Sequence, residues 1–241
     1  MEARFDSQLR IPISLCDREG RLSLWGAFSV FMDLAAEHAQ QLGVGAEDMM
    51  NRGLFWLTVK TKVRFVRRPA MMETVCVSTR PIAPERVRSV REYRMAQDGR
   101  ILIEGKTEWA VMETGTGRIH PMADVFAREL EMAPEPAFAA PFARIRPDFS
   151  GAEPVGSFTV RSVDTDIGGH MNNVAYLRAV LGVLSSEQVR ALPQGELELV
   201  FRAPCFEGET LQVLRRQIPE GCELGVMRPD GSAAVLIRAV R

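Results

Sequence analysis

The chain has 241 residues, of which 46% are hydrophobic and 25% are charged, an ordinary balance for a soluble globular protein with a sizeable core. A formal net charge of −1 offers no overall argument for binding nucleic acid or an anionic membrane. The first residues lack the apolar core of a signal peptide, and no apolar run approaches the length of a membrane span. We therefore expect a cytoplasmic protein without membrane association, whose widely spaced cysteines are free thiols.

The first half of the chain reads as a strand, a long helix and an antiparallel meander. Residues 4–15 are strand-like, and apolar residues then recur at three- and four-residue spacing over 27–42, which predicts an amphipathic helix closed by Gly43. A short helix is expected at 46–51. Four strands follow, of which the last two are joined by Asp98-Gly99, a strong hairpin signal. These strands are expected at 54–66, 73–80, 87–97 and 100–113.

Residues 131–155 are rich in proline and predict an extended linker that runs across the surface of one half. The second half then repeats the first, with a strand at 157–163, a helix at 173–184 and strands at 196–203, 209–217, 222–228 and 233–240. Asp17 and Gly20 align with Asp166 and Gly169, and the segment 73–77 aligns with 209–213. Matches in the same order indicate a duplicated unit.

We therefore predict an α+β protein with domains at 1–130 and 156–241, joined by a linker at 131–155. A unit of one long helix and a short meander buries its helix by wrapping the sheet around it. Two such units most economically form a tandem, or double, hotdog, in which two antiparallel sheets each wrap around a long central helix.

One segment differs between the two copies, and it holds the residues best suited to chemistry. The stretch 163–176 gathers acidic, glycine, histidine and amide residues before an apolar helix, whereas the copy after Asp17 is more apolar. Asp166 could take a proton from water or attack a carbonyl, or it could be only a turn or cap residue. His170 could orient a carbonyl, position water or donate to a thiolate, or it could be a structural hydrogen-bonding group.

Glycines and amides surround these two side chains. Gly168 and Gly169 let the backbone approach a ligand closely, and the first amides of the following helix could polarise a thioester carbonyl. Asn172 and Asn173 are good helix caps, and Tyr176 is expected to pack with its hydroxyl hydrogen-bonded. The residues expected to line the substrate site are Gly168, Gly169, Asn173 and Tyr176.

Two further groups need an interpretation. The thiol of Cys205 could form a nucleophile–base pair with a histidine, although buried cysteine is usually a small hydrophobic residue. Arg64, Arg67 and Arg68 could meet an acidic partner, although a solvated surface explains most charged residues. No residue grouping has metal-ligand spacing and no glycine-rich phosphate loop follows a strand, so we expect no metal and no cofactor.

The residues resemble those of the fatty acyl–acyl-carrier-protein (acyl-ACP) thioesterases of plants and bacteria. The likeness spans most of the chain. In the first half it rests on Leu34-Ala35-Ala36-Glu37-His38-Ala39, Gly53-Leu54-Phe55-Trp56 and Trp109-Ala110-Val111. In the second half it rests on Asp164-Thr165-Asp166, His170-Met171-Asn172-Asn173, Tyr176, Phe201-Arg202 and Cys205.

The resemblance implies a double hotdog that hydrolyses acyl-ACP thioesters to free fatty acids. It implies catalytic roles at Asp166 and His170, with Cys205 at a position once proposed as a nucleophile. The family usually has asparagine where this chain has Gly168 and glutamate where it has Pro204. Water must then be positioned without those polar groups, or by Asn172.

The expected function is hydrolysis of fatty acyl-ACP in fatty acid biosynthesis, with acyl carrier protein as partner and Arg64, Arg67 and Arg68 as its docking residues. One alternative is an acyl-CoA thioesterase with the same chemistry. Another is a non-catalytic hotdog protein that binds acyl groups. Further pairing of the tandem units into a homodimer is left open.

Overall fold

The computed structural model describes residues 3–192 and 194–241, which form two compact units, Met1–Pro141 and Phe142–Arg241. Residues 1 and 2 of the predicted first domain lie outside the described part. The boundary between the units falls inside the predicted linker, so its two halves belong to different units. Among the described residues, no helix is long and apolar enough to cross a membrane.

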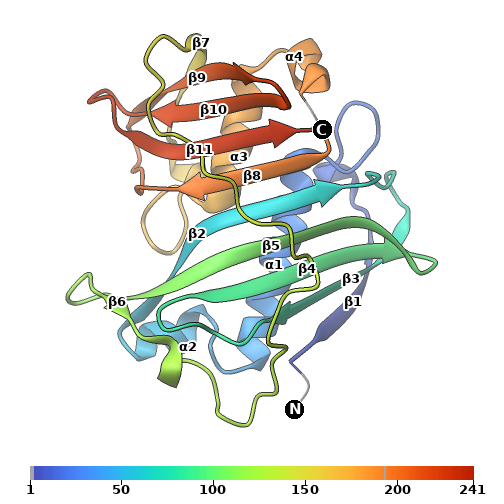
Figure 1. Ribbon diagram of the computed structural model, residues 1–241, viewed down its shortest axis with the longest axis vertical. Helices are drawn as coiled ribbons and strands as arrows, with labels where there is room; N and C mark the ends of the chain where they lie inside the picture. Colours follow the sequence, from blue (N-terminus) through green and yellow to red (C-terminus); the bar gives the residue numbers. More distant parts are fainter. Residues whose placement is uncertain (1–2, 193) are drawn as a thin grey trace. The chain divides into compact units, whose positions relative to one another are not determined.

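Unit 1 is an antiparallel sheet with a long helix on one face (Figure 1). Its strands follow the order β1-β3-β4-β5-β2, and β6 adds to β5. The helices are α1 (Leu24–Gln41) and α2 (Ala46–Asn51), with the 3₁₀ helices η1 (Ile13–Leu15) and η2 (Met122–Asp124). The strands are β1 (Phe5–Arg10), β2 (Leu54–Phe65), β3 (Thr74–Pro81), β4 (Ser89–Gln97), β5 (Arg100–Glu113) and β6 (Ile119–His120).

Unit 2 has the same topology in miniature. Its strands follow the order β7-β9-β10-β11-β8, which is the order of β1-β3-β4-β5-β2 in unit 1. The helices are η3 (Ser162–Asp164), α3 (Asn173–Val183) and α4 (Ser186–Ala191). The strands are β7 (Glu153–Thr159), β8 (Glu196–Phe201), β9 (Thr210–Ile218), β10 (Gly221–Met227) and β11 (Ala233–Val240). The predicted duplication is therefore confirmed at the level of strand order.

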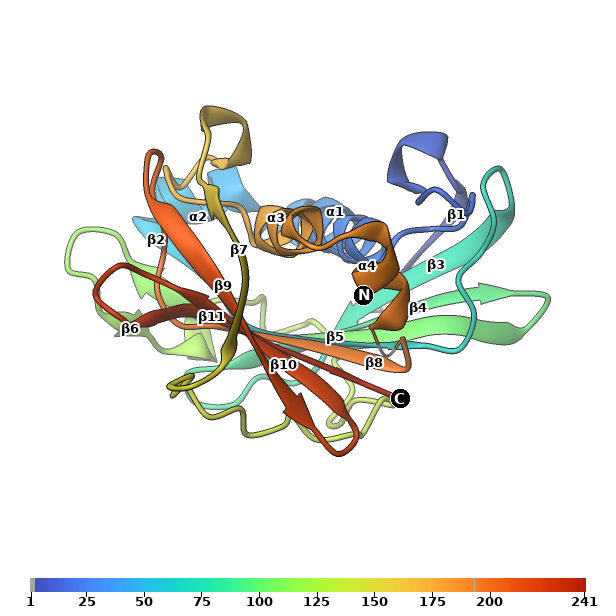
Figure 2. The same cartoon turned by 90° about the horizontal axis from the view of Figure 1, so that it is seen from above.

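In each unit the long helix packs on the sheet through its apolar face (Figure 2). In unit 1 the ring of Phe31 on α1 stacks on Tyr93 of β4, with ring centroids 4.9 Å apart. Gly105 on β5 makes room for this ring, because a Cβ there would lie 3.3 Å from Phe31 and 2.9 Å from the Lys62 carbonyl oxygen. In unit 2 the ring of Tyr176 on α3 meets Phe201 of β8 edge-on at 6.0 Å.

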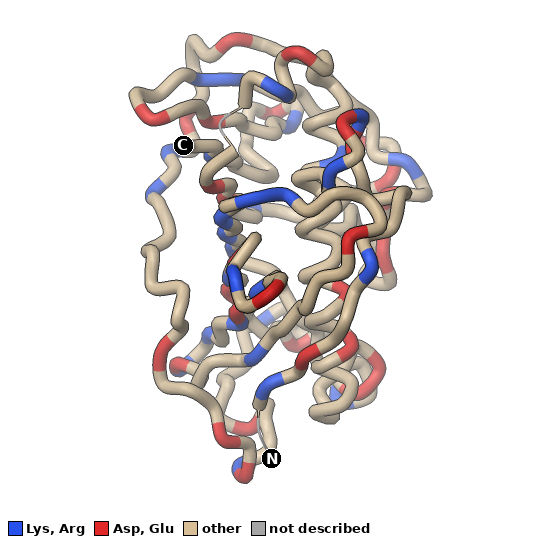
Figure 3. Tube along the Cα trace, turned by 90° about the vertical axis from the view of Figure 1, so that its right-hand side faces the viewer, with Lys and Arg blue, Asp and Glu red and all other residues tan. Residues whose placement is uncertain are grey.

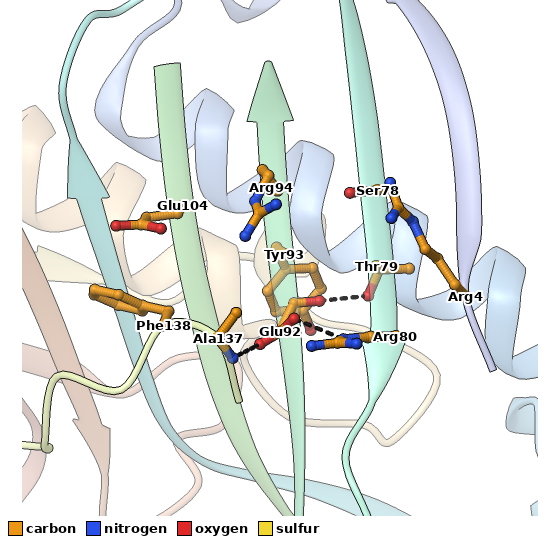
Figure 4. A pocket seen from close by; sticks show the side chains of 10 residues that line it. All are labelled: Arg4, Ser78, Thr79, Arg80, Glu92, Tyr93, Arg94, Glu104, Ala137 and Phe138. Atoms are coloured by element: carbon orange, nitrogen blue, oxygen red, sulfur yellow. Dashed lines mark hydrogen bonds and ion pairs between the residues drawn. The ribbon is translucent and has the colours of Figure 1, made fainter. Parts of the chain in front are cut away.

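The proline-rich segment lies against the other face of each sheet. In unit 1 the backbone N–H of Ala137 donates to the Glu92 carboxylate at 2.6 Å. Figure 4 shows Ala137 and Phe138 beside Glu92 and Glu104, and the guanidinium of Arg64 lies 4.7 Å from the centre of the Phe138 ring. In unit 2 the guanidinium of Arg216 lies 4.5 Å from the ring of Phe149. Each half of the segment is thus held on the surface of its own unit.

Most predicted elements are present, with displaced ends. The first strand stops at Arg10 instead of residue 15, because Pro12 has no N–H to donate and the chain turns into η1. Helix α1 begins three residues earlier than predicted, after Ser23, whose hydroxyl accepts the N–H of Gly26 at 2.9 Å. The hairpin at Asp98-Gly99 is confirmed, with φ of 49° and 75°. Helix α4 and strand β6 were not predicted.

Met72 has a backbone conformation better suited to glycine, and we predict that Met72→Gly stabilises the protein. Its φ is 65°, and Gly208, the corresponding residue of unit 2, has φ of 88°. A side chain in this left-handed region costs about 1 kcal/mol, and the Met72 side chain is half exposed. Chemical denaturation should show a gain of about that size. Met71→Gly is the control, since Met71 is as exposed but has an ordinary φ; an equal gain in both variants would contradict the argument.

Candidate active site

The polar stretch that follows β7 folds into a tight turn with a matching turn in unit 1. The backbone N–H of Asp166 donates to the carbonyl of His170 at 3.0 Å, and the N–H of Gly169 donates to the carbonyl of Asp166 at 2.9 Å. In unit 1 the N–H of Asp17 donates to Arg21 at 2.8 Å, and the N–H of Gly20 donates to Asp17 at 3.0 Å. The two turns therefore have the same backbone hydrogen bonds.

Each turn leads into its helix through a capping side chain. Asn172 is the N-cap of α3, and its side-chain oxygen accepts the N–H of Val174 at 2.9 Å. Ser23 occupies the same place before α1. Gly169 has φ of 73°, so the turn needs glycine at this position. Asn172 therefore has a structural role whatever else it does, and the turn is held in one conformation at both ends.

The turn brings the two predicted catalytic side chains together. The Asp166 carboxylate and the His170 imidazole approach to 3.7 Å, between Oδ1 and Nδ1, and each side chain keeps about a quarter of its area exposed. Oδ1 of Asp166 also accepts the N–H of Gly168 at 2.8 Å. Within the described residues, Oδ2 of Asp166 has no hydrogen bond or ion pair. One carboxylate oxygen is thus anchored and the other is available.

In unit 1 the equivalent carboxylate is neutralised. Arg68 donates through Nη1 to Oδ2 of Asp17 and to the carbonyl of Leu22. Burial raises the pKa of Asp17, but the hydrogen bonds from Arg68 and from the backbone of Arg21 and Glu19 outweigh it, so the net pKa lies below the ordinary value. The Arg68 side chain is only 11% exposed. The Asp17 turn is consequently a closed, structural version of the Asp166 turn.

Pro204 occupies the position in unit 2 that Arg68 occupies in unit 1. The correspondence follows from the backbone: the N–H of Leu22 donates to the carbonyl of Pro69 at 2.8 Å, and the N–H of Met171 donates to the carbonyl of Cys205 at 2.7 Å. The residue before each of these acceptors is Arg68 in unit 1 and Pro204 in unit 2. Proline has no charge to place beside Asp166, which accounts for the free Oδ2.

Cys205 holds the turn through its backbone. Its carbonyl accepts the N–H of Met171 at 2.7 Å, and its N–H donates to the hydroxyl of Tyr176 at 2.9 Å. The thiol is completely buried, and burial raises the pKa of Cys205. All four cysteines are free thiols. A buried thiol with a raised pKa has little thiolate at neutral pH, which disfavours a nucleophilic role.

Arg228, the residue after β10, also supports this loop and was not singled out from the sequence. Its guanidinium donates to the carbonyl of Pro204 and lies 3.9 Å from the sulfur of Cys205. The Glu209 carboxylate lies 3.8 Å from Nε of Arg228. Glu209 aligns with Glu73, which pairs with Arg67 at 2.8 Å. This alignment could have suggested that Glu209 also lies beside an arginine. No local sequence signal points to Arg228.

The predicted docking arginines lie in unit 1, and all three are paired. Arg64 bonds to Glu104 at 3.1 Å and Arg67 to Glu73 at 2.8 Å, and each keeps 40% of its side chain exposed. Arg68 is mostly buried against Asp17. Basic and acidic residues are interspersed along the chain (Figure 3). A docking role is therefore better supported for Arg64 and Arg67 than for Arg68, and it stays a prediction.

The remaining site residues fall near the same turn. Gly168 sits in the turn itself, and Asn173 is the first residue of α3. Within residues 3–192 and 194–241, no grouping of three His, Cys, Asp or Glu side chains could hold a metal ion. The arrangement in unit 2 is thus a carboxylate and an imidazole before a helix N-terminus, a constellation able to activate water beside a polarised carbonyl.

Family models match both units. Residues 2–130 match the model described as the acyl-ACP thioesterase N-terminal domain, and residues 151–230 match the acyl-ACP thioesterase C-terminal domain. Among curated proteins, the chloroplastic acyl-[acyl-carrier-protein] hydrolase FATB3 of Cuphea viscosissima is 23% identical over 207 residues, covering 79% of this chain and 49% of that protein. The chloroplastic palmitoyl-acyl carrier protein thioesterase of Cuphea hookeriana is 27% identical over 182 residues, covering 72% and 44%. The chain spans about half the length of the curated relatives it matches.

Solved structures share the fold over nearly the whole chain. An acyl-ACP thioesterase from Bacteroides thetaiotaomicron superposes with a TM-score of 0.88 at 18% identity, covering 99% of this chain and 97% of that one. The 12:0-ACP thioesterase from Umbellularia californica superposes with a TM-score of 0.84 at 20% identity, covering 99% and 96%. The observed α+β architecture, with its antiparallel strands, is therefore that of these proteins.

Proposed function

Because the chain belongs to the acyl-ACP thioesterase family, we propose that it hydrolyses a fatty acyl-ACP thioester to a free fatty acid and the carrier thiol, in fatty acid biosynthesis. The observation that carries the proposal is the contrast between the two turns. One carboxylate, Asp17, is neutralised by Arg68, and the other, Asp166, keeps an oxygen available beside His170. We further propose that the two units form the tandem hotdog, each sheet wrapped around its long helix.

In the proposed reaction Asp166 acts as a general base. Its free oxygen takes a proton from water as the water oxygen bonds to the thioester carbonyl carbon. The N-terminal end of α3 stabilises the negative charge that develops on the carbonyl oxygen. When the tetrahedral intermediate collapses, the C–S bond breaks, and the proton taken by Asp166 passes through the neighbouring His170 to the departing thiolate. The products are a fatty acid and a thiol.

The two departures from the family pattern have different consequences. Gly168 carries no side chain, so it cannot bind water as asparagine could. Its backbone N–H donates to Oδ1 of Asp166 at 2.8 Å and so orients the carboxylate. Pro204 is uncharged, so no positive side chain stands beside Asp166 at the position that corresponds to Arg68. We propose that water is held by the carboxylate of Asp166 and the imidazole of His170, while Asn172 stays occupied as the helix cap.

We predict that Cys205→Ala keeps kcat within about threefold of the wild type, because the thiol is buried and its pKa is raised. The backbone of residue 205 makes the supporting hydrogen bonds in either variant. Some stability should be lost, about 1 kcal/mol, through the small cavity that is left. Steady-state kinetics on acyl-ACP measures the effect. A loss of a hundredfold or more in a folded variant would show that the thiol is the nucleophile.

Matched substrates test the carrier. Wild-type protein is assayed on acyl-ACP and acyl-CoA of equal chain length, by the free thiol and the free acid released. A higher kcat/KM on acyl-ACP is the expected result, and a preference for acyl-CoA would replace the carrier assignment while leaving the chemistry intact. Retention of intact acyl thioester without release of acid would favour the non-catalytic acyl-binding alternative. Charge reversal at Arg64 and Arg67 should harm only the acyl-ACP reaction if these residues dock the carrier.

A further inference from the structure

Unit 1 buries an arginine that has no carboxylate partner. Arg91 on β4 is only 6% exposed. Its Nη1 donates to Nδ1 of His38 at 2.9 Å and to the Thr79 hydroxyl at 3.3 Å, and both partners are uncharged acceptors. Among the residues that the structure describes, no Asp or Glu pairs with Arg91. Arginine stays protonated in proteins, and a buried charge without a counter-charge is strongly unfavourable.

His38 does not relieve this charge. The ring is buried on α1 and stacks on Phe5, with ring centroids 5.6 Å apart. Burial, together with the neighbouring Arg91 charge, lowers the pKa of His38 to about 4. The imidazole is therefore neutral at physiological pH, and its Nδ1 accepts the Arg91 hydrogen bond. The pair carries one net positive charge.

Two more buried donors lie on the same face of the sheet. The Tyr93 hydroxyl and Nε1 of Trp109 are both buried, and neither makes a hydrogen bond of ordinary geometry among the described residues. Tyr93 lies two residues from Arg91 on β4, and Thr107 of β5 is paired directly opposite Arg91. Burial raises the pKa of Tyr93, while the Arg91 charge and weak hydrogen-bonding contacts with the Thr107 and Trp109 side chains lower it in part. Arg91, Tyr93 and Trp109 thus form a donor-rich cluster that has no carboxylate among the described residues.

The acidic residue nearest in sequence faces the opposite side of the sheet and is already bonded. Glu92 accepts from Nε of Arg80 at 2.7 Å and from the N–H of Ala137 at 2.6 Å. Figure 4 shows Glu92 and Arg94 in front of β4, under the proline-rich segment, whereas Tyr93 extends behind the strand towards α1. Glu92 therefore does not neutralise the charge of Arg91. Arg94 provides a matched arginine on the outer face of the same strand.

We propose that Arg91, Tyr93 and Trp109 form a buried binding site for a carboxylate. The planar guanidinium fork matches the two carboxylate oxygens. The phenol O–H and the indole N–H can each donate a hydrogen bond to a carboxylate oxygen. The surrounding side chains Phe5 and Phe31 are aromatic, so the ligand is a monocarboxylate with an apolar body. It is either a short-chain acid or the fatty acid that hydrolysis would release. Only the second source depends on the proposed function.

The site is tested by the thermal stability of the full chain in acetate, decanoate and chloride at equal ionic strength. A carboxylate at about a hundredfold excess over its Kd should raise the wild-type Tm by about 5 °C or more, beyond the change in chloride. A shift with acetate identifies a short-chain ligand, and a shift with decanoate alone identifies a fatty acid. No shift with either, or an equal shift with chloride, would overturn the proposal.

Variants localise the effect. Arg91→Met should abolish the shift and still fold, since an apolar side chain of similar length replaces an uncompensated buried charge. Tyr93→Phe removes one donor and should weaken binding about tenfold, which keeps the test informative if Arg91→Met fails to fold. Arg94→Met and Asp166→Asn should keep the full shift, so the outcome is independent of whether Asp166 is catalytic. A shift that persists unchanged in Arg91→Met and Tyr93→Phe would refute the site.

Discussion

Asp166→Asn is expected to lower kcat for acyl-ACP hydrolysis by about 10³-fold, with little change in KM, because it removes the general base and leaves the binding surface unchanged. The amide keeps an oxygen that can accept the N–H of Gly168, a bond of 2.8 Å in the wild type. The turn should therefore keep its conformation. Steady-state kinetics on acyl-ACP, with circular dichroism to verify folding, measures the effect.

The repeat supplies a matched control, Asp17→Asn. The Asp17 turn has the same backbone hydrogen bonds, but its carboxylate pairs with Arg68. This variant should leave kcat unchanged and lose about 1–3 kcal/mol of stability, because a partly buried partner of an arginine is removed. If Asp166→Asn kept full activity, or if both variants lost activity equally, the assignment of catalysis to the second turn would be wrong.

Pro204→Arg is expected to lower kcat by about 10²-fold by recreating the closed form of the turn. Arg68 shows the geometry: from the equivalent position it donates to the carboxylate of Asp17. An arginine at residue 204 should pair with Oδ2 of Asp166 in the same way and block the approach of water to that oxygen. Steady-state kinetics on acyl-ACP, with circular dichroism to verify folding, measures the effect.

Pro204→Gln is the control for this prediction. Glutamine is also a flexible polar side chain, and the carbonyl of residue 204 can still accept from Arg228, but it brings no charge. Activity should stay close to that of the wild type. Equal inhibition by arginine and glutamine would mean that proline matters for the backbone of the loop rather than for the charge beside Asp166.

The duplication could be predicted because the turn needs particular residues at particular places. Asp17 and Asp166 accept backbone N–H groups, and Gly20 and Gly169 adopt positive φ. Because both copies of the turn have these requirements, the aspartate precedes the glycine by three residues in each copy. The long helices and hairpins followed from periodicity and from turn residues such as Asp98-Gly99. Strand ends were less predictable, because local turns such as η1 interrupt a pattern that otherwise continues.

The long-range partners of the two turns could not be predicted, because they are distant in the chain. Arg68 meets Asp17 across 51 positions, and Arg228 meets Cys205 across 23. No local pattern encodes such contacts. Pro204 could be recognised as a departure from the family, but its physical meaning required the pairing of Arg68 with Asp17. The buried charge of Arg91 was hidden for the same reason, since strand alternation does not reveal which face lacks a carboxylate.

Direct attack of water on the thioester can be tested by a single turnover of acyl-ACP in ¹⁸O-labelled water. Enzyme in excess over substrate is quenched after one turnover, and the fatty acid is analysed by mass spectrometry. One ¹⁸O atom in the acid and a free carrier thiol are expected, because water activated by Asp166 should attack the carbonyl directly. Unlabelled acid in the first turnover, or intact acyl-ACP retained by the protein, would contradict this expectation.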